Sequence, residues 1–317
     1  MKRIKKLLGA SGGFTLIELI IVIAVMGFLV AMIVPRLAMI TEGASDTACD
    51  TNQTRLRQVV ANLQEATGQL PNYLTNLVTV VGTTYYKPCV DDNDKDTGKE
   101  ALSRDMDQYM HLCLHTLSAE EAEEIKDLGI MKVFNLNLSK DVDPDFAGPD
   151  SDQPYMQLID VAEGVGVMMI GAGDMVDGTD GWSQNDTVWY NTYDEFGTPP
   201  DLIYRIAFGV GKDSSLVKDG QLQHAALCPN GMRRADHFIY NNYNIVLPRL
   251  KSTVDELSTV ANVYKTITAE ADIGERKTFN VLEAQEIWQF TTFCPEGCQP
   301  ATAGIAETWT FIDGTTL

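Results

Sequence analysis

The carboxylate of Glu18 is the one ionisable side chain in a mostly apolar run from Phe14 to Val34. If this run is helical, with a rise of 1.5 Å per residue, it spans about 31 Å, close to the hydrocarbon thickness of a bilayer. Because an ionised carboxylate is costly in hydrocarbon, such a residue inside a membrane segment usually has a function. The sequence therefore predicts a membrane helix with a role beyond anchoring.

Two acidic segments carry oxygen ligands at spacings that suit calcium. The first opens like a calcium loop, but its glycine, Gly98, comes one place late, and Ser103 stands where a bidentate glutamate is expected. The second is turn-rich. In both, a solvated acidic loop is the alternative to a calcium site. The candidate ligands are Asp92, Asp94 and Asp96 in the first segment and Asp174, Asp177, Asp180 and Asp186 in the second.

Two histidines flank a cysteine at alternate positions, His111, Cys113 and His115, so a strand would place all three on one face. With Cys89 they could bind zinc. A disulfide between Cys89 and Cys113, with solvent-facing histidines, is the alternative that an oxidising compartment favours.

All six cysteines follow the apolar run, and their even number is consistent with disulfides formed in an oxidising compartment. Turn residues between the last two would also allow a small closed loop. The disulfide candidates are Cys49, Cys89, Cys113, Cys228, Cys294 and Cys298.

Composition and motifs argue against several classes of function. The chain carries 44 acidic and 24 basic side chains, a net charge of -20, which argues against nucleic-acid binding by a basic face. It has no P-loop, zinc-protease, serine-hydrolase or haem-attachment motif. The paired glycines of Gly164-x-Gly166 and Gly171-x-Gly173 lack the third glycine of a dinucleotide loop and indicate tight strand packing. We expect no enzyme activity and no required cofactor, although calcium could bind.

The residues before the apolar run set its orientation. They include Lys2, Arg3, Lys5 and Lys6, so the N-terminus is expected in the cytoplasm and the bulk of the chain outside. An ordinary signal peptide has a shorter apolar core that is followed by a cleavage site of small residues. This run is longer and no such site follows it, so an ordinary signal peptide fits poorly.

The run also has a specific motif: Gly13 is followed by FTLIEL with Glu18 at the fifth place, Gly27 lies inside the run, and Pro35 follows it. This pattern resembles the class III signal and N-terminal helix of type IV pilins and type II secretion pseudopilins. The resemblance implies that a prepilin peptidase cuts after Gly13 and N-methylates Phe14. The leader of residues 1–13 is longer than is usual for this signal.

Physical reasoning supports a role for Glu18 in assembly. After cleavage the amine of Phe14 would be a lone charge in a bundle of apolar helices, and Glu18 of a neighbouring helix could neutralise it. The alternative is that Glu18 reaches to the cytoplasmic headgroups. Pro35 lacks a backbone donor and clashes with the carbonyl of Ala31, so we expect the helix to bend or loosen between Gly27 and Pro35.

Beyond Pro35 the apolar residues keep a helical period to Gly68, where a stop is expected. We therefore expect a leader (1–13), a membrane and assembly helix (14–67) and a globular head (68–317). The expected fold class is α+β and pilin-like, with the long helix packed on an antiparallel sheet and a head enlarged by helical and loop insertions.

Local patterns predict elements of the head. A capping box of Ser118 and Glu121 predicts a helix over 119–128, and helical spacing predicts another over 248–265, within a possible helical sub-region at about 230–293. Strands are predicted by apolar or β-branched runs at 131–138, 164–173, 201–210 and 308–312, and an extended or loop segment is predicted at 75–86.

Together these patterns favour a structural subunit of a type IV pilus-like filament. The resemblance implies as partners copies of the chain or related pilins, the prepilin peptidase and an inner-membrane assembly platform. It places the chain in the inner membrane before assembly and in an extracellular filament or periplasmic pseudopilus afterwards. The alternatives are a type II secretion pseudopilin and, in a different class, a membrane-tethered ectodomain that binds calcium or another ligand.

Overall fold

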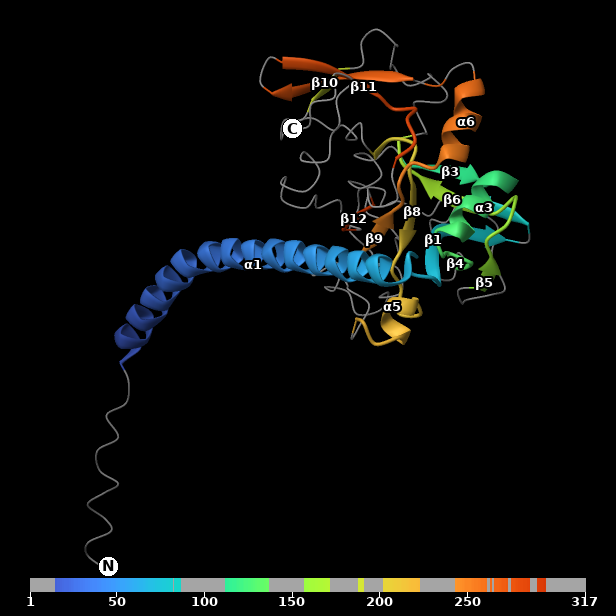
Figure 1. Ribbon diagram of the computed structural model, residues 1–317. Helices are drawn as coiled ribbons and strands as arrows, with labels where there is room; N and C mark the ends of the chain where they lie inside the picture. The colour runs from blue at the N-terminus through green and yellow to red at the C-terminus, as the bar shows by residue number, and fades with distance from the viewer. Residues whose placement is uncertain are drawn as a thin grey trace, which may run out of the picture. The chain divides into compact units, whose positions relative to one another are not determined.

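Helices and strands are combined in an α+β fold in this computed structural model (Figure 1). Contacts divide the chain into two compact units, residues 1–47 and 48–317, each described by itself. The structure describes residues 15–81, 83–86, 112–136, 157–171, 188–190, 202–222, 243–260, 263, 265–272, 275–285 and 290–294.

The first element is the helix α1, Leu16–Thr67, which is 52 residues long. It ends where the sequence predicts, because Gly68 has a φ of 73° and its N–H donates to the carbonyl of Gln64 at 2.7 Å. Glycine adopts this left-handed conformation at little cost, which makes it a common helix terminator.

The C-terminal part of α1 contributes one face to the core of the head. Cys49, Leu56 and Val60 are buried in the hydrophobic cluster of the second unit, whereas Arg55 and Glu65 are exposed. The predicted amphipathic pattern is therefore confirmed for this part of the helix.

Nine of the described strands form one sheet in the order β12-β9-β8-β1-β4-β5, with β2 paired to β1 and β6 paired to both β3 and β8. The strands are β1 (Leu74–Val81), β2 (Thr84–Tyr86), β3 (Cys113–Thr116), β4 (Lys132–Leu136), β5 (Gln157–Asp160), β6 (Gly166–Met169), β8 (Ile206–Gly209), β9 (Asn244–Val246) and β12 (Thr291–Phe293). Their positions agree with the predicted extended segments at 75–86, 131–138, 164–173 and 201–210.

This sheet is mixed rather than antiparallel. β1 and β4 are parallel, with Leu74 opposite Val133, while the neighbouring pair of β4 and β5 is antiparallel. The physical reason is the long connection between β1 and β4, which contains β3 and α3 and returns the chain in its original direction. The expectation of an antiparallel sheet was wrong at this pair.

A second, three-stranded sheet consists of β7 (Val188–Tyr190), β10 (Thr266–Asp272) and β11 (Glu275–Asn280), in the order β11-β10-β7. Within 230–293, where the sequence suggested a helical sub-region, the described residues form one helix, α6 (Lys251–Thr259), and the strands β9 to β12. The helix ends earlier than predicted because its C-cap residue, the β-branched Val260, has an extended backbone with φ of -78° and ψ of 133°.

The predicted capping box begins the helix α3, Ala119–Asp127. The backbone N–H of Glu121 donates to Oγ of Ser118 at 3.2 Å, and the N–H of Ser118 donates to Oε2 of Glu121 at 3.0 Å. A further short helix, α5, covers Ser215–Lys218.

The N-terminus of α6 is capped by a side chain from α3. The N-cap residue of α6, Leu250, offers no side-chain acceptor. Instead Glu124 accepts hydrogen bonds from the backbone N–H groups of Lys251 and Ser252, both at 2.9 Å, and from Oγ of Ser252 at 2.5 Å. A carboxylate there satisfies orphan donors and interacts favourably with the helix dipole. Glu124 therefore fastens α3 to α6.

Gly166 allows Tyr85 to pack against the backbone of β6. A Cβ added to Gly166 would lie 2.5 Å from Cγ of the Tyr85 ring. The tight strand packing that the paired glycines predicted is confirmed at this position.

We predict that Glu124→Ala lowers the free energy of unfolding of the full chain in detergent by about 1–2 kcal/mol, because α6 loses its cap. Glu123→Ala is the matched control, since Glu123 is exposed on the same helix, and its effect should stay within about 0.5 kcal/mol. Chemical denaturation measures both variants. Equal effects would contradict the capping role.

We also predict that Gly166→Ala destabilises the head by about 1–3 kcal/mol, because the new methyl group overlaps the Tyr85 ring. Gly211→Ala is the control, since a Cβ there would meet its nearest neighbour, Oγ1 of Thr75, at 3.9 Å. Thermal unfolding of the two variants provides the comparison, and unchanged stability of Gly166→Ala would rule out the close packing.

Candidate functional site

Glu18 is bonded to Thr15 at the start of α1. Oε2 of Glu18 accepts hydrogen bonds from the backbone N–H of Thr15 at 2.9 Å and from its Oγ1 at 2.7 Å. The N–H of Glu18 donates in return to Oγ1 of Thr15 at 3.3 Å. This is a capping box, so Thr15 and Glu18 begin the helix as a unit. Both contacts of the Glu18 carboxylate with Thr15 use Oε2.

The helix residues that follow are apolar on every side. The segment Leu16–Val34 has a mean hydropathy of 3.0 and none of it is buried. Its large hydrophobic side chains are between 45% and 75% exposed. By length and composition the segment can cross a membrane. A helix that is apolar all round needs hydrocarbon or other helices around it.

The helix is unbroken through Gly27 and Pro35. A Cβ at Gly27 would meet no atom within 4 Å, so this position presents open backbone to a neighbour. The predicted bend or loosening between Gly27 and Pro35 stays a prediction. Gly13 and Phe14, the predicted processing residues, lie outside the described residues.

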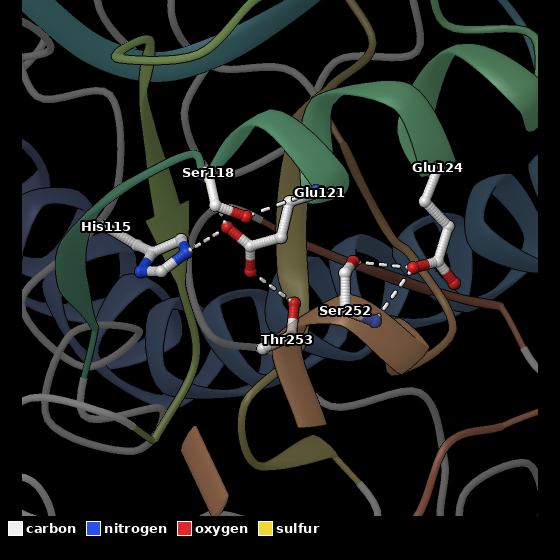
Figure 2. A network of polar contacts seen from close by, with 6 residues as sticks. All are labelled: His115, Ser118, Glu121, Glu124, Ser252 and Thr253. Atoms are coloured by element: carbon white, nitrogen blue, oxygen red, sulfur yellow. Dashed lines mark hydrogen bonds and ion pairs between the residues drawn. The ribbon is translucent and has the colours of Figure 1, made fainter. Parts of the chain in front are cut away.

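A second group of polar side chains lies in the head, where β3, α3 and α6 meet (Figure 2). His115 comes from β3, Glu121 from α3 and Thr253 from α6. Nε2 of His115 is 2.8 Å from Oε2 of Glu121, and Oγ1 of Thr253 donates to Oε1 of Glu121. The Glu121 carboxylate is fully buried and His115 is 15% exposed. The carboxylate therefore joins three elements.

The electrostatic state of Glu121 follows from these contacts. Burial, the largest influence, raises the pKa of the carboxyl, but its hydrogen bonds with His115, Thr253 and Ser118 and its electrostatic interaction with His115 outweigh this effect. The net result is a pKa below the ordinary value for glutamate. Glu121 is thus ionised at neutral pH despite its burial.

An acidic cleft of about 570 Å³ lies beside this group, between α3 and α6. Six of its lining residues are carboxylates, with one lysine among them, so its field attracts cations. Its lining residues are Ser118, Glu120, Glu123, Glu124, Asp127, Lys251, Ser252, Asp255 and Glu256.

The structure describes some of the residues that the sequence singled out as ligands or disulfide partners. Cys49 and Cys294 are buried, and Cys113 is half-buried on the same face of β3 as His115. Cys89, His111, Cys228 and Cys298 lie outside the described residues, as do all the calcium candidates: Asp92, Asp94, Asp96, Asp174, Asp177, Asp180 and Asp186. The disulfide pairings and the calcium sites therefore stay predictions.

The sequence alone identified some of the polar side chains around Glu121 in the head and missed the others. It identified Glu121 only as the N3 residue of a capping box, and it assigned His115 to a set with Cys113. Thr253 and Glu256 gave no signal, because they approach Glu121 from a helix more than 130 positions away in sequence.

Comparison with known proteins identifies the N-terminal segment. Residues 9–34 match the family described as "Prokaryotic N-terminal methylation motif". No curated protein and no solved structure matches the chain significantly. The chain therefore carries the N-terminal methylation motif and hydrophobic helix typical of type IV pilins and pseudopilins, which implies a prepilin-like inner-membrane precursor that prepilin peptidase processes for assembly with pilin-like subunits.

Proposed function

We propose that this chain is a non-enzymatic structural subunit of a type IV pilus-like filament, assembled through its N-terminal helix after cleavage behind Gly13. The observation that carries the proposal is the joint occurrence of the methylation motif over residues 9–34 with an apolar helix that the rest of its own chain leaves exposed. A plain anchor needs the apolar helix but has no use for a processing motif or for Glu18.

Glu18 supplies the polar contact between subunits. Cleavage makes the amine of Phe14 a positive charge one residue before the capping box. Thr15 holds Glu18 through Oε2, so Oε1 can accept the Phe14 amine of a neighbouring subunit. In a water-free bundle such a pair costs far less than either charge alone.

The partners follow from this function. The prepilin peptidase acts on the precursor in the inner membrane, an assembly platform there extracts the processed chain, and copies of the chain or related pilins surround its helix in the filament. The acidic head is then on the outside, where its charge keeps the surface soluble.

Processing is tested by mass spectrometry of the mature N-terminus. We expect a chain that begins with N-methylated Phe14. Gly13→Val should leave the leader attached, because a branched side chain replaces the glycine at the expected cut, whereas Gly12→Ala should be processed. A wild-type chain that retains residues 1–13 would overturn the proposal.

Assembly is tested with Glu18→Ala. The variant should be processed and inserted in the membrane, yet its amount in filaments should fall at least tenfold, since the loss of one buried partner costs about 3–5 kcal/mol. Glu65→Ala is the matched control, because Glu65 is exposed on the C-terminal part of the same helix. Normal incorporation of Glu18→Ala would refute the charge pairing.

The same preparations separate a pilus from a pseudopilus. Mechanical shearing of cells should release the wild-type chain in extracellular filaments. Retention of the processed chain in the periplasm, with loss of protein secretion when it is deleted, would favour a type II secretion pseudopilin instead.

A further inference from the structure

We propose that His115, Glu121 and Glu256 form a binding site for a divalent transition-metal ion, with Zn²⁺ as the best-matched ion. The site lies in the head and does not depend on the proposed assembly function. The three side chains come from β3, α3 and α6, and their ligand atoms all lie within 4.8 Å of one another.

The distances require only a small adjustment to admit an ion. Zinc bonds to nitrogen and oxygen are about 2.0–2.2 Å long, which places the ligand atoms of a tetrahedral site about 3.3 Å apart. Nε2 of His115 and Oε2 of Glu121, now at 2.8 Å, would separate by about 0.5 Å. Glu256 is exposed, so its long side chain can swing inward to complete the set.

The donor types select the metal. An imidazole nitrogen suits zinc and its neighbours and is a poor ligand for calcium or magnesium, which prefer oxygen. Two carboxylates balance the two positive charges of the ion. Three protein ligands leave a fourth tetrahedral position for water.

The surroundings of Glu121 already have the form of a supported ligand. The hydroxyl of Thr253 and the backbone N–H of Ser118 both donate to its carboxylate (Figure 2). Such contacts fix the orientation of a metal-binding carboxylate. The acidic cleft that Glu256 also lines adds an attractive field for cations.

A structural hydrogen bond that fastens β3 to α3 would equally explain His115 and Glu121. It would not explain Glu256, which has no part in that pair yet lies within reach of both ligand atoms. Glu256 is therefore the residue on which a test should be based, and its exposure means that Glu256→Gln leaves the fold intact.

The experiment titrates the full-length chain in detergent, stripped of metal by a chelator, with Zn²⁺ in a calorimeter. One site is expected, and both Glu256→Gln and His115→Gln should weaken binding at least tenfold. Glu120→Gln is the matched control: it removes an exposed carboxylate of the same cleft that is not a ligand, and its affinity should stay within about twofold of wild type.

Substitution with Co²⁺ provides a second readout that bulk charge does not affect, because tetrahedral cobalt absorbs visible light far more strongly than hydrated, octahedral cobalt. The wild-type chain and Glu120→Gln should show this absorption, and Glu256→Gln should lose it. Absence of a stoichiometric Zn²⁺ site, or equal weakening by Glu120→Gln and Glu256→Gln, would overturn the proposal, since binding would then be absent or due to the general field of the cleft.

Discussion

The apolar surface of α1 between Leu16 and Val34 is the constraint on which the rest of the structure depends. None of this segment is buried by its own chain, and water would be an unfavourable surrounding for it on every side. Only hydrocarbon or other helices can cover it. The processing motif implies that the two surround it in turn, first the bilayer and then pilin-like subunits.

Within the head, polar contacts join two helices: the face of α3 that carries Glu121 and Glu124 is hydrogen-bonded to α6. The two residues are three positions apart, so they lie on one side of the helix. Glu121 accepts a hydrogen bond from the hydroxyl of Thr253 in α6, and Glu124 accepts hydrogen bonds from the first two backbone N–H groups of the same helix. Burial of a carboxylate is costly, and several directed donors offset that cost here. Hydrogen bonds from two carboxylates of α3 therefore help to specify how α3 and α6 meet.

Local rules predicted the elements of this chain better than their arrangement. The capping box of Ser118 and Glu121 and the terminator Gly68 were found from the sequence, because each depends on neighbours within four positions. The parallel pairing of β1 with β4 and the approach of Thr253 to Glu121 were not, since both depend on segments far apart in the chain. The capping box of Thr15 and Glu18 also has a local signal, T-x-x-E, which lies inside the apolar run.

The charge of the chain explains why the proposed assembly must depend on the helix. Residues 1–13 carry four basic and no acidic side chains, so the proposed cleavage after Gly13 would change the net charge from -20 to about -24. Heads of this charge repel one another, and salt screens the repulsion only in part. Transfer of the apolar segment Leu16–Val34 from lipid to a bundle adds no hydrophobic free energy, because both surroundings are apolar. The stabilisation must come from close packing, which the open backbone at Gly27 permits, and from neutralising a charge otherwise isolated in an apolar medium. Glu18 is the residue of this segment that can provide the second contribution.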